Sequence, residues 1–304
     1  MIIATDKLHE EARNVLKGFG LVEATADDST LARCEVLMTW PSKLSLTLLA
    51  NMKRLRAIQT ISAGVDDIDF AAIPPTVKVF SNVGAYTDPV AEHAWGLLLG
   101  VAKGTSVRKA KTEPYILKGK TLLVLGCGAI GSEVARIGRE AFGMKTIGVS
   151  RSFKFPEVFD RRLPTDKLVD AIGEADAIVD SLPLNLQTRS ILDQTILSMA
   201  KNKVVIVNVG RAETIDEVSI TRKLKERPET RFATDVFWRR SGKEDFKSPL
   251  WDLPNFGGSL HTAGGFGSED TLRYAELKAA ENVRLLLTSG RAENQVRVED
   301  YLKK

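Results

Sequence analysis

Three glycines at fixed spacing are the first feature of this chain that could do chemistry. They are Gly126, Gly128 and Gly131, in the segment LLVLGCGAIG at 122–131. Four apolar residues precede them and a segment with helical periodicity follows, so the expected context is strand, tight turn and helix. There the first glycine permits the turn, the second lets a pyrophosphate approach the backbone, and the third lets the helix pack on the sheet. The segment predicts a dinucleotide site that includes Ala129 and Ile130, with the phosphates at a helix N-terminus.

The end of the next predicted strand, 146–149, indicates which dinucleotide would bind. An Asp or Glu at this place normally holds the ribose 2′-hydroxyl of NAD. Here the residues are Ser150, Arg151 and Ser152. A guanidinium and two hydroxyls suit a 2′-phosphate, through charge-assisted hydrogen bonds. The sequence therefore favours NADP, and NAD bound beside a solvated Arg151 is the alternative.

Three histidines are candidates for the acid that protonates a reduced carbonyl oxygen. His9 lies among charged residues and is expected to be solvated. His93 opens an apolar helix predicted over 88–103, where packing or a hydrogen bond is the expected role. His261 follows a predicted strand, 256–260, and the carboxyl ends of such strands are where open α/β sheets bind ligands. We therefore take His261 as the candidate acid.

Two further strand ends carry charged residues. Arg211 follows the predicted strand 204–208, where it could grip a substrate carboxylate, and a surface salt bridge is an equally weighted alternative. Asp235 lies inside the predicted strand 232–236, and a carboxylate there is costly unless it is paired. A nicotinamide carboxamide is one partner that could pair with it.

The predicted elements form two α/β series. The first has strands at 2–5, 21–25, 35–40, 57–61 and 77–81, and the second at 122–125, 146–149, 177–182, 204–208, 232–236 and 256–260. A last helix is expected between Ser268 as its cap and Gly290. The predicted fold class is α/β, with two Rossmann-like or flavodoxin-like parallel-sheet domains and an interdomain cleft. Residues 1–84 and 268–304 would form the discontinuous substrate-binding domain, and residues 85–267 the Rossmann NAD(P)-binding domain.

Composition sets the outer limits. The 304 residues are 43% hydrophobic and 27% charged, and the net charge of +4 comes from 43 basic and 39 acidic residues spread along the chain. This argues against a nucleic-acid binder. Cys34 and Cys127 are far apart, which argues against a disulfide or a metal site. The opening MIIATD does not resemble a signal peptide, and the apolar run 94–102 is too short to cross a membrane, so a cytoplasmic protein is expected.

Several segments together resemble one family along essentially the whole chain. They are SAGVDDID at 62–69, NVGAYTDPVAEH at 82–93, LPLNLQTR at 182–189, NVGRAETID at 208–216, DVF at 235–237 and HTAGG at 261–265. With the glycine loop, they resemble the D-isomer-specific 2-hydroxyacid dehydrogenases. The resemblance implies that Arg211 binds the substrate carboxylate, His261 transfers the proton and Asp235 holds the nicotinamide amide. It also implies substrate contacts from the backbone of Ala63, Gly64 and Val65, a homodimer formed through the cofactor domain, and cofactor contacts from Leu182, Pro183, Thr188, Val209, Gly210, Ala263 and Gly264.

The chain departs from the family pattern at one critical position. The family places a Glu, which pairs with the catalytic histidine, three residues after DVF, and this chain has Arg240 there. A guanidinium beside His261 would confine reduction to lower pH. Glu244 or Asp245, in the same polar loop, is the alternative source of a carboxylate.

The predicted function is that of an NADP-dependent reductase of glyoxylate, hydroxypyruvate or a similar small 2-keto acid. Two alternatives stay open. One is a binding protein that senses a nicotinamide cofactor without turnover, and the missing Glu favours it. The other is a formate dehydrogenase-like enzyme, because HTAGG and the missing Glu both resemble that branch of the family.

Overall fold

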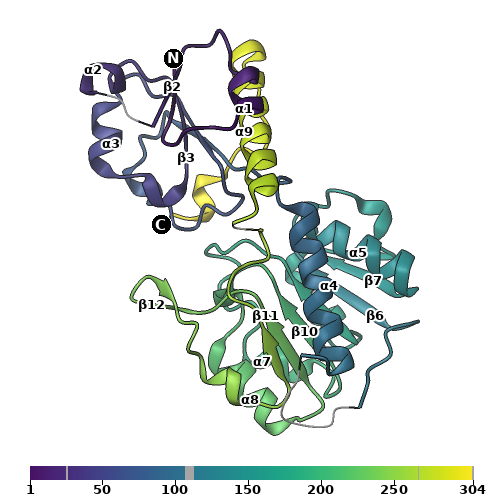
Figure 1. The fold of residues 1–304 in the computed structure, drawn as a ribbon. Coiled ribbons are helices and arrows are strands. Elements are labelled where there is room, and N and C mark those ends of the chain that lie inside the picture. The colour runs from purple at the N-terminus through teal and green to yellow at the C-terminus, as the bar shows by residue number, and fades with distance from the viewer. Residues whose placement is uncertain (25–26, 107–112, 266, 303–304) are drawn as a thin grey trace. The chain divides into compact units, whose positions relative to one another are not determined.

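Two compact units make up the chain (Figure 1). The computed structural model describes residues 1–24, 27–106, 113–265 and 267–302. The first unit combines Met1–Tyr86 with Gly265–Lys304, and the second is Thr87–Gly264. Both ends of the chain, purple and yellow in Figure 1, therefore belong to the first unit.

The first unit is built on a parallel sheet with the strand order β2-β1-β3-β4-β5. Its strands are β1 (Ile2–Ala4), β2 (Leu21–Glu23), β3 (Val36–Thr39), β4 (Ala57–Thr60) and β5 (Lys78–Phe80). This order is that of a flavodoxin-like sheet. Each predicted strand is present, and each is one to two residues shorter than predicted, because its terminal residues already belong to the flanking loops.

Short helices and one long helix complete this unit. They are α1 (Glu10–Val15), α2 (Asp28–Leu31), α3 (Leu46–Asn51) and α9 (Glu269–Ser289), with 3₁₀ turns η1 (Pro41–Lys43), η2 (Phe70–Ala72) and η7 (Val298–Asp300). Helix α9 packs against α1 and β4. It begins after Ser268, whose side chain accepts a hydrogen bond from the Thr271 amide, and ends at Gly290 in the left-handed conformation. The predicted limits of this helix are confirmed.

The second unit is built on a larger parallel sheet with the order β14-β11-β10-β9-β6-β7-β8. Its strands are β6 (Thr121–Leu125), β7 (Lys145–Val149), β8 (Arg161–Leu163), β9 (Ala177–Asp180), β10 (Val205–Asn208), β11 (Arg231–Thr234) and β14 (Phe256–Gly258). Six of the seven were predicted. The charged, three-residue β8 was missed because it has no apolar run.

Helices cover both faces of this sheet. They are α4 (Thr87–Lys103), α5 (Ala129–Phe142), α6 (Val169–Ile172), α7 (Gln194–Met199) and α8 (Glu217–Glu226), with turns η3 (Pro156–Val158), η4 (Thr165–Lys167), η5 (Ala212–Thr214) and η6 (Pro249–Asp252). Helix α4 packs on α5, β10, β11 and β14. Trp95 of α4 stacks on Phe142 of α5 with ring centroids 4.5 Å apart, which joins these helices on one face.

Apolar strands explain why this sheet lies in the centre of its unit. Leu122, Leu123, Val124 and Leu125 of β6 are fully buried, as expected for a parallel strand that is covered on both faces. The core beneath α6, α7 and α8 continues through Ile178 and Ile206. The predicted fold class, two parallel-sheet α/β domains, is confirmed by these sheets.

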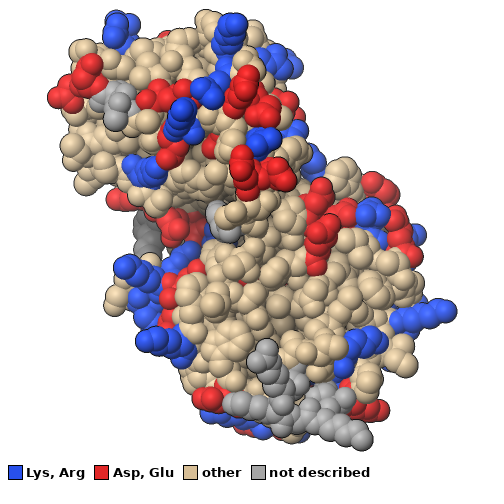
Figure 2. Space-filling view, in the orientation of Figure 1, with Lys and Arg blue, Asp and Glu red and all other residues tan. Residues whose placement is uncertain are grey.

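Charges of both signs lie close together on the face of the molecule drawn in Figure 2. This distribution agrees with the spread of basic and acidic residues along the sequence. Among the described residues, no helix has the length and apolar character needed to cross a membrane. The described part of the chain also has no cluster of three or more His, Cys, Asp or Glu side chains arranged to hold a metal ion.

Candidate active site

The glycine loop between β6 and α5 has the geometry of a dinucleotide cradle. Gly126 has a φ of +84°, so the turn after β6 uses the left-handed conformation that glycine tolerates. A Cβ on Gly131 would lie 2.0 Å from the Gly126 carbonyl oxygen, so only glycine fits where α5 meets the turn. A Cβ on Gly128 would meet no atom within 4 Å. The open side of the loop is therefore at Gly128, where a pyrophosphate would need close access to the backbone and to the N-terminus of α5, which starts at Ala129 and Ile130.

The residues that follow β7 lie beside this loop. The Gly126 amide donates to the carbonyl of Val149, the last residue of β7, at 3.0 Å. Ser150, Arg151 and Ser152 come next, and Arg151 and Ser152 are exposed. The Ser152 amide donates to Ser150 Oγ at 3.4 Å. These side chains thus lie at the sheet edge where the adenosine ribose of a dinucleotide bound to the loop would be expected.

Loops after β9 and β10 form the neighbouring part of the same edge. Leu182 is buried, and a Cβ on Gly210 would lie 2.5 Å from its carbonyl oxygen, so the two loops are in close contact. Thr188 Oγ1 donates to the Pro183 carbonyl at 2.6 Å, which closes the loop after β9. Together with Val209, these predicted cofactor residues gather beside the glycine loop, since β9 pairs with β6.

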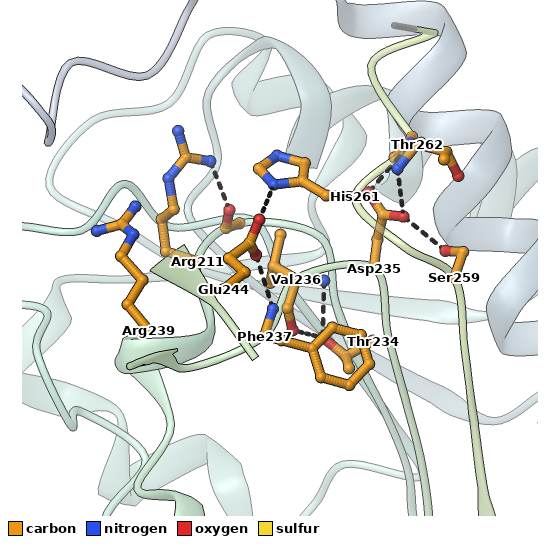
Figure 3. A network of polar contacts seen from close by, with 12 residues as sticks. Arg211, Thr234, Asp235, Val236, Phe237, Arg239, Glu244, Ser259, His261 and Thr262 are labelled. Atoms are coloured by element: carbon orange, nitrogen blue, oxygen red, sulfur yellow. Dashed lines mark hydrogen bonds and ion pairs between the residues drawn. The ribbon is translucent and has the colours of Figure 1, made fainter. Parts of the chain in front are cut away.

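Arg211 stands at the start of the turn that follows β10. Its carbonyl oxygen accepts hydrogen bonds from Asn208 Nδ2 at 3.0 Å and from Thr214 Oγ1 at 2.6 Å. Its Nη1 donates to the Gly210 carbonyl at 2.8 Å. Arg211 follows β10 and His261 follows β14, so the predicted cation and the predicted acid both stand at the carboxyl edge of the same sheet, and both are drawn in Figure 3.

Asp235 holds the loop that carries His261. It follows the last residue of β11, Thr234, and does not lie inside the strand as predicted. Its carboxylate is buried and accepts hydrogen bonds from Ser259 Oγ at 2.6 Å, the Thr262 amide at 2.8 Å and the Ala263 amide at 2.9 Å. Its carbonyl oxygen accepts from the His261 amide at 2.7 Å. The loop from Ser259 to Ala263, which Gly264 follows, is thus held by hydrogen bonds to the Asp235 carboxylate.

A small hairpin brings a carboxylate to His261. Strands β12 (Arg239–Arg240) and β13 (Lys243–Glu244) pair antiparallel. The two residues between them, Ser241 and Gly242, have φ values of +51° and +80°, as a tight two-residue hairpin turn requires. Glu244 on the returning strand accepts from the Phe237 amide at 2.8 Å through Oε1, and its Oε2 is 2.5 Å from His261 Nδ1 (Figure 3).

The expected role of Arg240 at the histidine is therefore wrong. Arg240 is exposed and forms an ion pair with Glu217, at the start of α8, and this partner raises the pKa of the guanidinium. The hairpin turn carries the chain past Arg240 and returns a carboxylate four positions later. Of the two alternatives in this loop, Glu244 contacts His261, while Asp245 Oδ1 accepts a hydrogen bond from the Lys247 amide.

The predicted substrate residues lie in the first unit. Ala63, Gly64 and Val65 follow the carboxyl end of β4. Ser62 Oγ donates to the Gly64 carbonyl at 2.8 Å, and Val65 is buried in the core of this unit. This loop is ordered by its own contacts at a strand end, the kind of position where parallel sheets bind ligands.

The two other histidines also form polar contacts. His93 was expected to pack or form a hydrogen bond, and its Nε2 lies 2.6 Å from Ser259 Oγ and 3.5 Å from Asp235 Oδ1. His9 was expected to be solvated, but its Nδ1 is 2.8 Å from the buried Glu276 carboxylate of α9. In both cases the partner is far away in the sequence, and no local pattern marks it.

Known proteins are similar to this chain over most of its length. The family model described as "D-isomer specific 2-hydroxyacid dehydrogenase, NAD binding domain" matches residues 77–263. The chain belongs to the D-isomer-specific 2-hydroxyacid dehydrogenase family. This dehydrogenase is therefore a nicotinamide-dependent oxidoreductase that acts on CH–OH donors, and the resemblance seen in the sequence is confirmed.

Three relatives illustrate the range within the family. The D-3-phosphoglycerate dehydrogenase of Methanocaldococcus jannaschii is 30% identical over 97% of this chain, which spans 59% of that relative. The glyoxylate reductase of Aeropyrum pernix is 30% identical over 79% of this chain and 76% of its own length. A solved structure from Pyrobaculum aerophilum, provisionally described as a formate dehydrogenase, is 33% identical, covers 99% of both chains and has a TM-score of 0.84.

Proposed function

We propose that this dehydrogenase reduces a small 2-keto acid, of the glyoxylate or hydroxypyruvate kind, with NADP(H). The contact between Glu244 and His261 carries the proposal, because it restores the carboxylate and imidazole pair that Arg240 had put in doubt. A carboxylate at Nδ1 favours the imidazolium that must give up a proton during reduction. Arg211 supplies the cation that such a substrate needs.

Each residue of the candidate site would have a separate role in substrate binding or proton transfer. Arg211 binds the substrate carboxylate and stabilises negative charge that develops on the keto oxygen. The amides around Gly64 bind the other side of that carboxylate. Since Nδ1 of His261 faces Glu244, the other ring nitrogen, Nε2, is the atom that gives its proton to the keto oxygen. When bound, the nicotinamide supplies the hydride that reaches the keto carbon.

The glycine loop would hold the cofactor. The residues beside it would be Leu182, Pro183, Thr188, Val209 and Gly210. The residues near the nicotinamide would be Asp235, Ala263 and Gly264. Arg151, with Ser150 and Ser152, would bind a 2′-phosphate. The exposed position of Arg151 directly after β7 supports this assignment. Residues 85–267 would form the cofactor domain, and residues 1–84 with 268–304 would form the substrate domain.

A homodimer formed through the cofactor domain is part of the proposal. Figure 2 shows a broad surface without charged side chains over much of α4, beyond the acidic side chains near the start of that helix. Depletion of charge is typical of the core of a protein interface. Leu97 and Leu99 of α4 are partly exposed. Sedimentation of the purified chain at several concentrations tests this point, and a monomer at all of them would contradict it.

Formate oxidation is the second candidate, because the similar structure from Pyrobaculum aerophilum has that description. Oxidation of formate to carbon dioxide transfers a hydride and leaves no alkoxide to protonate, so it has no need for the Glu244 and His261 pair. The same pair argues against a cofactor sensor without turnover, since binding alone requires no proton donor.

One panel separates these functions. Glyoxylate, hydroxypyruvate, larger 2-keto acids and formate are each offered with NADPH or NADH, or with the oxidised cofactor for formate, and the nicotinamide absorbance is followed. We expect the highest kcat/KM with glyoxylate or hydroxypyruvate and NADPH. Turnover of formate alone would replace the proposal with the second candidate, and binding without any turnover would indicate a sensor.

A further inference from the structure

His93 connects α4 to the loop that carries the candidate acid. It lies in the second turn of α4, and its partner Ser259 follows β14, 166 positions later. The His93 Nε2 atom is 2.6 Å from Ser259 Oγ, and Ser259 Oγ is 2.6 Å from Asp235 Oδ1. The three side chains thus form a short hydrogen-bonded chain that ends on a buried carboxylate.

The direction of these hydrogen bonds follows from the groups involved. The Asp235 carboxylate accepts from Ser259, Thr262 and Ala263, and an ionised carboxylate can only accept. The Ser259 hydroxyl has one proton, which it gives to Asp235. It must then accept from His93, so the proton of the His93 ring is on Nε2.

This chain of bonds ends on the loop that carries His261. That residue has a φ of +53°, a left-handed conformation that is strained for a residue other than glycine. The loop keeps it because Asp235 binds the amides on its C-terminal side, the Ser259 hydroxyl on its N-terminal side and the His261 amide itself. These contacts together fix the backbone of His261, and with it the position of the imidazole beside Glu244.

We propose that His93 is a positioning residue for His261: its Nε2–H fixes the Ser259 hydroxyl on Asp235, and Asp235 then holds the His261 loop in its strained conformation. The link to turnover rests on the proposed function, whereas the bonded chain itself does not. In the described part of the chain the His93 ring contacts Ser259 and Asp235, and it would act on His261 through these two residues.

Nitrogen-15 NMR of the histidine rings tests the bonded chain without any substrate. The protein has three histidines, so three ring systems are expected, and His93→Gln identifies the signals of His93. We expect a proton on Nε2 of His93 and a changed His93 signal in Ser259→Ala. A neutral His93 ring protonated only at Nδ1 would overturn the proposal.

The same spectra report on the loop. His93→Leu removes the donor and should move the ring signals of His261. His93→Gln, whose amide nitrogen can take the place of Nε2, should leave them close to those of the unmodified protein. Signals of His261 that are the same in all three proteins would overturn the proposal even if His93 carries its proton on Nε2.

Kinetics test the consequence for turnover. With the best 2-keto acid of the panel, His93→Leu should lower kcat roughly 10- to 100-fold, because a small displacement of the proton donor is enough to do so. The KM for the keto acid should change little, since Arg211 still grips the carboxylate, and His93→Gln should recover most of kcat. His9→Gln is the matched control. Equal losses in the Leu and Gln variants would contradict a role based on donation.

The two proposals fail in different ways. If no 2-keto acid is turned over by the unmodified protein, the proposed function fails, and the NMR measurements still decide the bonded chain. If turnover is found and His93→Leu leaves kcat unchanged, the proposed function stands and the positioning role of His93 is wrong.

Discussion

Glu244 Oε2 lies 2.5 Å from His261 Nδ1, although the family pattern places this carboxylate at position 240. The contact is possible because the β12–β13 hairpin sets Glu244 opposite Arg239 in register. A turn of two residues thus changes which position in the sequence supplies the partner of the histidine. Arg240, displaced from that role, pairs with Glu217.

Replacement of this carboxylate tests its role. In Glu244→Gln, reductive kcat/KM should fall by about tenfold or more, because the imidazolium loses its stabilising charge. Steady-state kinetics of both proteins measure this loss. Asp245→Asn is the control and should keep its activity, and a loss of activity in the control alone would show that the wrong carboxylate was assigned.

Activity should depend on the guanidinium of Arg211 and not only on its positive charge. Arg211→Lys should lose most turnover while NADPH binding, measured by nicotinamide fluorescence, stays nearly intact. A lysine cannot reproduce the planar, two-point grip of a guanidinium on a carboxylate. Arg240→Lys provides the matched comparison on an exposed arginine and should keep its activity. Unchanged turnover in Arg211→Lys would rule out the role given to this residue.

Cofactor preference is expected to depend on Arg151. NADPH should give a higher kcat/KM than NADH, and Arg151→Ala should raise the KM for NADPH by a factor equivalent to about 1 to 3 kcal/mol, the value of a lost charge-assisted bond. Its KM for NADH should hardly change. Steady-state kinetics with both cofactors check the prediction, which is contradicted if the unmodified protein uses NADH equally well or better.

Two glycines of the loop should respond differently to alanine. Gly131→Ala places a Cβ 2.0 Å from the Gly126 carbonyl oxygen, so the folded state should be destabilised by about 1 to 3 kcal/mol or more. Gly128→Ala meets no atom within 4 Å and should keep its melting temperature, but the methyl group should obstruct a pyrophosphate. Thermal melts and NADPH titrations of both variants separate the effects. Unchanged NADPH affinity in Gly128→Ala would argue against this loop as the phosphate site.

The buried carboxyl group of Asp180, at the end of β9, should make the stability of the protein depend on pH. Burial raises the pKa of Asp180 to about 6, although hydrogen bonds from Thr214 and Leu182 oppose the shift. A group whose folded pKa is raised contributes stability below its unfolded pKa, near 4, and loses that contribution as the pH rises through about 6. Asp180→Asn should therefore remove this dependence.

The comparison is made by melting both proteins across this pH range. The melting temperature of the unmodified protein relative to Asp180→Asn should decrease by a few degrees between pH 4 and pH 7. A constant difference between the two proteins would show that folding does not raise the pKa of Asp180.

Much of the fold could be predicted because its signals are local. The apolar run of β6, the glycines that follow it and the helical periodicity of α5 are adjacent in the sequence, and each reflects a steric or burial requirement of that segment alone. The Ser268 cap and Gly290 mark α9 for the same reason. Arg211 and His261 were found because strands of a parallel sheet end at a common edge.

Contacts between distant segments could be decided only by the tertiary structure. Whether Arg240, Glu244 or Asp245 would meet His261 depended on the register of a two-residue turn, which no apolar pattern specifies. The bond between His93 and Ser259 depends on how α4 packs on the end of β14. The sequence by itself thus determined most of the strands, the glycine loop and the family, since these follow from local sterics and burial. The partners of His261 and Asp235 were decided by three-dimensional packing. A hydrogen bond is made or lost when the distance between its two atoms changes by a few tenths of an ångström, and spacing along the chain does not encode such differences.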